Sequence, residues 1–412
     1  MARDGLIVGI DVGTAKVAVV VGTANEGVLS ITGVSSVAHS GMRKGVIVDP
    51  EETVSAIAHA LEDVERLCGS NITHALVAIN GAHVQAQPAQ GVVAVAKPSG
   101  EIQPDDIQRV IEAAKTVALP QNRELIHVFP HHFMVDGQEE IRDPVGMNGV
   151  RLEVHALIVS AAASALRNLT RAVEQSGIEI DGLVFGPLAV AKALTTKKQR
   201  DSGVAVVDIG AGTTALAVFE EGELLHCACL PIGSMHITND IAIGLRTNLD
   251  VADALKLKYG SAWAENVRDS ESVSLAILDP AEDERVARKQ ICEIIEARVL
   301  EIFSLLGDEL KKVGKDGLLP AGVIFTGGGS ELEGLTELAR HHLRLPATIG
   351  FPTAQISGML DKLDNPIYAT GVGLVLWGNE EGREPNAPWR LNLGKFGGVF
   401  ERFRGILRNF TH

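Results

Sequence analysis

The stretch that decides the fold is VAVVDIGAGTTALAVFEEGELLHCACL, residues 204–230. Its apolar runs predict three short strands, one ending in VVD at 206–208, one over 215–219 and one from Leu224. The turn between the first two strands, DIGAGTT at 208–214, joins glycines to hydroxyl residues. Glycine lets backbone N–H groups close around phosphate, and an aspartate at a strand end can hold a hydrated divalent cation. The turn is therefore a candidate phosphate-binding turn.

A second stretch of the same kind, LIVGIDVGTAKVAVVVGTANEGVLSITGV, begins at Leu6. The same reasoning predicts a strand, a turn and a returning hairpin with its bend at Gly22, over residues 6–10, 11–16, 17–21 and 28–34. Asp11 and Asp208 each precede a glycine, a hydroxyl residue and a hairpin. This repetition predicts a duplicated domain whose two phosphate-binding turns face each other across a cleft.

A third glycine-rich segment, GGGS at 327–330, follows a predicted strand over 321–326 and precedes a helix expected from Glu331. Glycines at a helix N-terminus suit a ribose or phosphate edge. A single turn of this type is compatible with an ordinary tight hairpin, but two turns and a third glycine site together favour a nucleotide cleft. No GxxxxGK[ST] pattern is present, so a Walker-type NTPase is excluded. Lys16, inside the first turn, is placed to reach a phosphate.

Composition limits the classes of protein open to this chain. Its 412 residues are 46% apolar, enough for a large core and more than one domain. The net charge of −15 argues against nucleic acid as a partner. The four cysteines form no CxxC pair, which fits a reducing cytosol. The histidine pairs at 131–132 and 341–342 lack HExxH or CxxC company and are interpreted as surface residues rather than metal ligands.

The order of predicted elements gives an α/β fold with a duplicated domain and an inserted α+β subdomain. A helix is expected from the N-cap Asp49 to Gly69, and a long one over 282–313. The Gln-, Pro- and Gly-rich stretch 85–100 marks the insertion, with a strand near 92–96. The predicted parts are the first domain (1–84 and 161–200), the inserted subdomain (85–160), the second-domain core (201–234), its small subdomain (235–314), the remaining core and closing helix (315–377), a flexible linker (378–394) and an amphipathic helix (395–412).

The end of the chain differs from the rest in charge and periodicity. Residues 395–412 carry a net charge of about +3, with one apolar stripe at helical spacing. A cationic amphipathic helix behind a loose linker is typical of an anchor on anionic lipid, whereas the alternative is an ordinary terminal helix packed on the core. The residues expected at the bilayer are Phe396, Phe400, Phe403, Ile406, Leu407 and Phe410, with Arg402, Arg404 and Arg408 on the polar side.

The two turns and the GGGS segment resemble the superfamily of actin, sugar kinases and heat-shock-chaperone ATPases, which is built from duplicated ribonuclease-H-like domains. More specific stretches are similar to the FtsA family of bacterial cell-division proteins over nearly the whole chain, namely NGAHV (80–84), IHVFP (126–130), DPVGM (143–147), VVDIG (206–210) and ITNDIA (237–242). The resemblance implies an actin-like fold, ATP and Mg²⁺ in the cleft, self-polymerisation on the cytoplasmic face of the cell membrane at the division site, and docking of the C-terminal peptide of FtsZ and of other division proteins.

The resemblance also implies roles for individual residues. The phosphates would lie between two sets of residues, Gly13, Thr14 and Lys16 on one side and Gly210, Gly212, Thr213 and Thr214 on the other. Asp11 and Asp208 would face the water shell of Mg²⁺. The adenosine would lie against Gly327, Gly328, Gly329 and Ser330, with Lys289, Gln290 and Glu293 near the base. Arg298 matches a position on the family's FtsZ-docking surface.

One departure from the wider superfamily bears on catalysis. The filament-forming ATPases often place a water-orienting carboxylate or amide in the turn that matches Phe185-Gly186-Pro187, and this chain has none there. No catalytic residue is assigned, and ATPase activity is expected to be weak or absent. The sequence leaves two alternatives open. One is an actin-like pilus-assembly ATPase, against which the predicted terminal helix argues, and the other is a small-molecule kinase, for which no aspartate base can be assigned.

Overall fold

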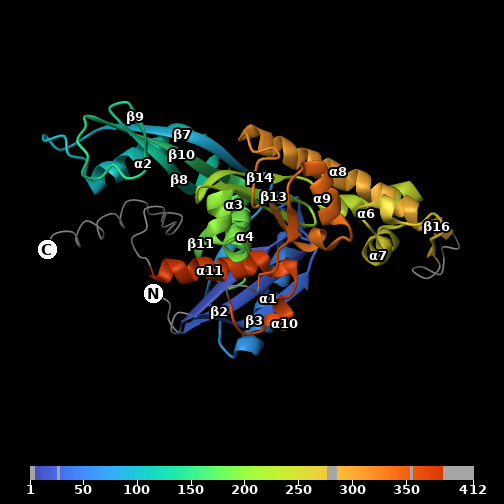
Figure 1. The fold of residues 1–412 in the computed structure, drawn as a ribbon. Coiled ribbons are helices and arrows are strands. Elements are labelled where there is room, and N and C mark those ends of the chain that lie inside the picture. The colour runs from blue at the N-terminus through green and yellow to red at the C-terminus, as the bar shows by residue number, and fades with distance from the viewer. Residues whose placement is uncertain (1–4, 26–27, 276–284, 353–355, 384–412) are drawn as a thin grey trace.

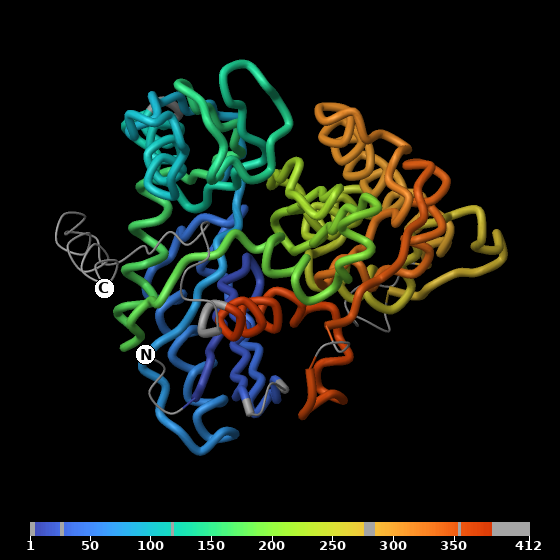
Figure 2. The backbone as a smooth tube through the Cα atoms, turned by 60° about the vertical axis from the view of Figure 1, so that its left-hand side comes forward, coloured from blue at the N-terminus to red at the C-terminus, as the bar shows by residue number. Residues whose placement is uncertain are grey.

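The computed structural model describes residues 5–25, 28–275, 285–352 and 356–383. Two five-stranded sheets and one four-stranded sheet carry most of the strands (Figure 1). Figure 2 shows the inserted subdomain above the first domain and the second domain beside the first domain, on the right. The fold is α/β, as the sequence predicts.

The first sheet has the strand order β11-β6-β1-β2-β3. β2 is antiparallel to both β1 and β3, whereas β6 is parallel to β1 and to β11. Carboxyl ends of β1, β6 and β11 therefore meet at one edge, where ligands bind in open α/β sheets. The strand bounds are β1 (Leu6–Val12), β2 (Lys16–Asn25), β3 (Val28–Ala38), β6 (His74–Ile79) and β11 (Glu179–Phe185).

The second sheet repeats this topology, with the order β14-β13-β12-β17-β18. β12 forms an antiparallel hairpin with β13 and pairs in parallel with β17, which pairs in parallel with β18. The bounds are β12 (Val204–Ile209), β13 (Thr214–Glu220), β14 (Glu223–Leu230), β17 (Val323–Thr326) and β18 (Ala347–Ile349). The matching orders of the two sheets confirm the predicted duplication.

The inserted subdomain is a four-stranded antiparallel sheet with α2 (Pro104–Ala118) packed on it. Its strands are β7 (Val84–Ala94), β8 (Arg123–Val135), β9 (Gln138–Ile141) and β10 (Arg151–Ala162). A Cβ at Gly91 would lie 2.0 Å from the Val110 carbonyl oxygen, so this glycine lets α2 approach β7. The predicted strand near 92–96 thus starts earlier, at Val84, because Gly91 serves helix packing rather than a loop.

Helices flank the sheets of both domains. In α1 (Pro50–Cys68) the N-cap Asp49 accepts a hydrogen bond from Glu52 N–H, and Gly69 ends the helix at φ 67°, as predicted. The remaining α-helices are α3 (Ala163–Gln175), α4 (Gly186–Leu194), α5 (Lys197–Ser202), α6 (Ser234–Leu245), α7 (Leu249–Tyr259), α8 (Arg288–Lys312), α9 (Leu335–Leu343), α10 (Leu360–Leu363) and α11 (Ala369–Arg383).

Three predicted boundaries are wrong for local reasons. Gly22 lies inside β2, where a Cβ would lie 2.6 Å from Val375 of α11, so it makes room for a helix and does not form a bend. α8 begins at Arg288, because Arg285–Ala287 pair as a strand with Ser272–Ser274. The glycines at 328 and 329 form one 3₁₀ turn with Ser330 and Glu331, and α9 begins only at Leu335.

The helix α11 returns from the second domain to the first and packs against α4 (Figure 1). A Cβ at Gly373 would lie 2.0 Å from the Ala189 carbonyl oxygen, so the two helix backbones are in close contact. α11 continues to Arg383, six residues beyond the predicted closing helix and into the stretch expected to be a linker. The rest of that linker and the predicted terminal helix 395–412 lie outside the described residues. Within the described ranges, no helix is long and apolar enough to cross a membrane.

Candidate nucleotide-binding cleft

A cavity of about 660 Å³ lies between the two domains. Its walls come from the ends of β1 and β12, the glycines after β17, the end of α7 and the segment before α11. Of the predicted residues, those on its surface are Asp11, Gly13, Thr14, Lys16, Asp208, Gly210, Thr213, Gly327, Gly328 and Gly329. The duplicated topology thus brings most of the predicted site into one cavity.

The two candidate phosphate-binding turns, 11–16 and 208–214, have the same backbone closure. Gly13 N–H donates to the Lys16 carbonyl oxygen at 2.9 Å, and Gly210 N–H donates to that of Thr213, also at 2.9 Å. The turns also touch, since a Cβ at Gly212 would lie 2.7 Å from Thr14 Oγ1. Their facing arrangement is the one that the repetition in the sequence predicts.

The two aspartates are buried and interact electrostatically. The pKa of Asp11 is raised to about 7, mainly by burial and to a smaller extent by the nearby Asp208 carboxylate. The positive charge of Lys16 acts in the opposite direction and lowers this pKa. Burial also raises the pKa of Asp208, although Lys16 and a hydrogen bond from Thr370 at 3.4 Å favour its ionised form. Two carboxyl groups desolvated together are stabilised by a cation between them.

Lys16 is largely enclosed in the cleft. Burial lowers its pKa, while the charges of Asp11, Asp208 and Glu331 act in the opposite direction. Its Nζ donates to the Ile367 carbonyl oxygen at 2.9 Å and lies 5.7 Å from the centre of the Tyr368 ring. Lys16 of the first domain therefore contacts the segment that leads into α11.

Six residues predicted for the cleft are not on the cavity surface: Gly212, Thr214, Lys289, Gln290, Glu293 and Ser330. Thr214 Oγ1 donates to the Ile232 carbonyl oxygen at 2.9 Å, and Ser330 Oγ donates to the Gly327 carbonyl oxygen at 2.7 Å. Both hydroxyl groups therefore stabilise the backbone of the glycine-rich segments and are not used on the cavity surface. Gly212 contacts the opposite turn instead. Lys289 pairs with Asp269 at 2.6 Å and Glu293 is exposed, so the structure does not bring this part of α8 to the cavity.

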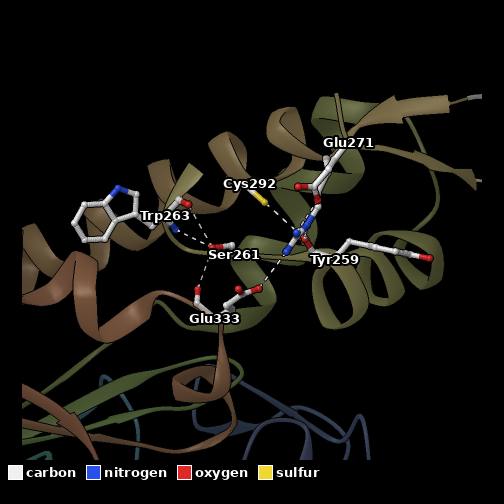
Figure 3. Close-up of polar contacts among 7 residues, drawn as sticks. Tyr259, Ser261, Trp263, Glu271, Cys292 and Glu333 are labelled. Atoms are coloured by element: carbon white, nitrogen blue, oxygen red, sulfur yellow. Dashed lines mark hydrogen bonds and ion pairs between the residues drawn. The ribbon is translucent and has the colours of Figure 1, made fainter. Parts of the chain in front are cut away.

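The wall at the end of α7 is fixed by a polar network that the sequence does not reveal (Figure 3). Ser261 is 3% exposed and donates to the backbone oxygens of Glu333 at 3.3 Å and Trp263 at 3.4 Å. Arg288 donates to Glu333, to Glu271 and to the Tyr259 carbonyl oxygen. The network joins α7 and α8 to the segment after the GGGS glycines, and Gly260 and Glu333 of that wall line the cavity.

Some cavity residues have no role predicted from the sequence. They include Asn80, Lys256, Glu331 and Thr370. Asn80 is part of the stretch NGAHV, which carried the family resemblance but no assigned role. No spacing rule connects it with the turns, because β6 reaches the cleft only through sheet pairing.

Arg298 lies away from the cavity on α8. Its Nε and Nη2 donate to the two carboxylate oxygens of Asp240 on α6 at 2.5 and 2.9 Å, and Glu301 accepts from Nη1. Its side chain is 24% exposed, so it remains partly accessible from solvent.

Comparisons with known proteins agree with this architecture. The family model "Cell division protein FtsA" matches residues 205–373, and the model "SHS2 domain inserted in FTSA" matches residues 81–160. The cell division protein FtsA of Pseudomonas aeruginosa is 37% identical, over 90% of this chain and 89% of its own length. That of Bacillus subtilis is 38% identical, over 91% of this chain and 84% of its own length.

Solved structures resemble the fold at low sequence identity. A chain of the PilM-PilN type IV pilus biogenesis complex matches with a TM-score of 0.66 at 18% identity, over 90% of this chain and 98% of its own. MreB 5 of Spiroplasma citri, bound to AMPPNP, matches with a TM-score of 0.56 at 12% identity, over 92% and 98%. Fold, cavity and insertion together define an actin-like protein with an inserted SHS2 domain. The chain belongs to the FtsA family of bacterial cell-division proteins and has a role in division.

Proposed function

We propose that the chain binds ATP with Mg²⁺ between its two domains, polymerises on the cytoplasmic face of the cell membrane and tethers FtsZ filaments there, helping to recruit other division proteins. The observation that carries the nucleotide part is the pair of touching turns with two buried aspartates and Lys16 between them. The division role of the family supports the rest.

The residues that line the cavity have the chemistry needed to bind a nucleotide together with a divalent cation. Backbone N–H groups of two glycine turns and one lysine supply donors for phosphate oxygens. The raised pKa values of Asp11 and Asp208 identify a place where positive charge is stabilising, which Mg²⁺ and its water shell would supply. Beside them, the buried Asn80 Oδ1 has no hydrogen-bond partner among the described residues, as is expected where a ligand or its water completes the hydrogen bonding.

Binding at this place would link nucleotide to the relative position of the domains. Thr14 and Lys16 belong to the first domain, while Gly210 and Thr213 belong to the second, so a phosphate held by both domains favours the closed state. A closed subunit of fixed shape is what a filament requires. The main effect of the bound nucleotide would then be to hold the two domains of the subunit in the closed state.

Membrane attachment is proposed from the sequence of residues 395–412, whose apolar stripe and positive charge suit anionic lipid. FtsZ docking is proposed at α6 and α8, around Arg298. An acidic peptide would compete there with Asp240 for the guanidinium.

Co-sedimentation with anionic vesicles and FtsZ tests the proposal, with and without ATP. The full chain is compared with a chain that ends at Leu393. We expect the full chain to pellet and to carry FtsZ with it, more so with ATP, and the shortened chain to stay in the supernatant with FtsZ. Equal pelleting of both chains would contradict the membrane anchor. Pelleting of the full chain without FtsZ would contradict the tether.

A further inference from the structure

Asn80 stands at the edge of the first sheet where three parallel strands end. It follows β6, whose last residue, Ile79, pairs with Phe185 of β11, so Asn80 is level with Gly186. On its other side β6 pairs with β1, which carries Asp11. Asn80 lines the cavity together with Asp11 and Asp208.

One hydrogen bond orients the Asn80 amide, and its oxygen is an unused acceptor in the described part of the chain. Its Nδ2 donates to Asp11 Oδ1 at 3.5 Å, and because a carboxylate accepts hydrogen bonds, the NH₂ end faces Asp11. The other end, Oδ1, is buried and has no hydrogen-bond partner in the described part of the chain. Native proteins keep such an atom where a ligand or an ordered water supplies the partner.

Gly186 makes room for this amide. A Cβ at position 186 would lie 2.2 Å from Asn80 Oδ1 and 2.6 Å from Nδ2. A side chain at 186 and the Asn80 amide would therefore occupy the same space. The terminal torsion of asparagine is broad, so the amide can turn Oδ1 towards a ligand in the cavity.

We propose that Asn80 positions the water that attacks the terminal phosphate of bound ATP, in place of the polar side chain that is missing at Gly186. This inference rests on the proposed ATP binding. The water oxygen forms a bond to the terminal phosphorus as the bond from that phosphorus to the bridging oxygen breaks. The electron pair leaves with ADP, and the water proton passes to the released phosphate. Asn80 Oδ1 accepts a hydrogen bond from the water and is not protonated.

The test uses the full chain and compares Asn80→Ala with the unaltered protein. Three quantities are measured: ATP affinity by calorimetry, single-turnover hydrolysis, and affinity for ADP with aluminium fluoride, a mimic of the transferring phosphate. We expect ATP affinity within about threefold, hydrolysis at least about tenfold slower, and binding of the mimic weakened by a similar factor. Asn71→Ala, an exposed asparagine before β6, is the matched control and should change none of them.

A second variant separates positioning from folding. Gly186→Gln placed in the Asn80→Ala chain puts an amide into the vacated space, and partial recovery of hydrolysis supports the proposal. Asn80→Ser replaces Asn80→Ala if the alanine variant loses ATP binding through misfolding.

Two results overturn the proposal alone: unchanged hydrolysis and unchanged binding of the mimic in Asn80→Ala, or ATP binding without hydrolysis by the unaltered chain. Absence of ATP binding by the unaltered chain overturns the proposed function and this proposal with it.

Discussion

Thr14 of the first domain and Gly212 of the second are in such close contact that a Cβ at position 212 would lie 2.7 Å from Thr14 Oγ1. The contact joins the two candidate phosphate-binding turns directly. The contact also explains why residue 212 is a glycine. The sequence predicts that Gly212 binds phosphate, whereas in the structure it makes room for Thr14.

Gly212→Val should push the turns apart and weaken ATP binding at least about tenfold, about 1.4 kcal/mol. Calorimetric titration of ATP with Mg²⁺ checks this. Gly307→Ala is the control, because a Cβ there meets no atom within 4 Å and the residue lies inside α8. Equal affinities of Gly212→Val and the unaltered chain would show that the turns do not hold the ligand jointly.

Lys16→Met should also weaken ATP binding by about tenfold or more, because one charged donor to phosphate is lost. Since Lys16 lowers the pKa values of Asp11 and Asp208, the variant should also need a higher pH for Mg²⁺-dependent binding. Titrations at several pH values measure both effects. Lys289→Met is the matched control, since Lys289 is not on the cavity surface, and a loss of affinity there would restore α8 as a wall of the base site.

His127 predicts an acid limit to stability. Burial lowers its pKa from 6.5 to about 3, and its Nε2 accepts from Phe185 N–H at 3.1 Å. The unfolded chain binds the proton first, so the contribution is complete above about pH 6.5 and is lost as the pH falls. From about pH 7 to about pH 5 the free energy of unfolding should drop about 2 kcal/mol more in the unaltered chain than in His127→Gln.

Denaturant unfolding at the two pH values measures that difference. His74→Gln, whose side chain is 52% exposed, is the control and should keep the slope of the unaltered chain. Parallel slopes for His127→Gln and the unaltered chain would mean that His127 is not held neutral by burial.

Arg298→Ala should weaken binding of the C-terminal peptide of FtsZ, by about tenfold if the guanidinium contacts a carboxylate of the peptide. Asp240→Asn should strengthen it, because the competing carboxylate loses its charge. Fluorescence anisotropy with a labelled peptide measures both. Arg66→Ala, an exposed arginine on α1, should change nothing. A peptide affinity that is the same in all four proteins would place the docking surface elsewhere.

The sequence predicts those parts of the site that are contiguous in the chain. The turns 11–16 and 208–214 each carry their aspartate, glycines and hydroxyls within seven residues, so local chemistry is enough to recognise them. Asn80 and Ser261 cannot be recognised in this way. Strand pairing brings Asn80 to the cavity, and the packing of α7 brings Ser261 to the cavity wall.

Glycines were the main source of wrong boundaries. Gly22 and Gly91 look like bends or loop residues in the sequence, but both lie in strands that a helix approaches closely. Whether a glycine allows a turn or a close contact depends on a partner far away in the chain. That partner is visible only in the folded structure.

The affinity of the full chain for ATP with Mg²⁺, compared with that of Asp208→Ala, tests the central claim most directly. Asp208 is the first residue of the second turn, and its carboxyl group is buried in the cavity wall that also contains Asp11 and Lys16. We predict tight binding by the unaltered chain and a loss of at least about tenfold in Asp208→Ala and likewise in Gly328→Val. Normal ATP affinity in both variants would contradict the assignment of the cleft.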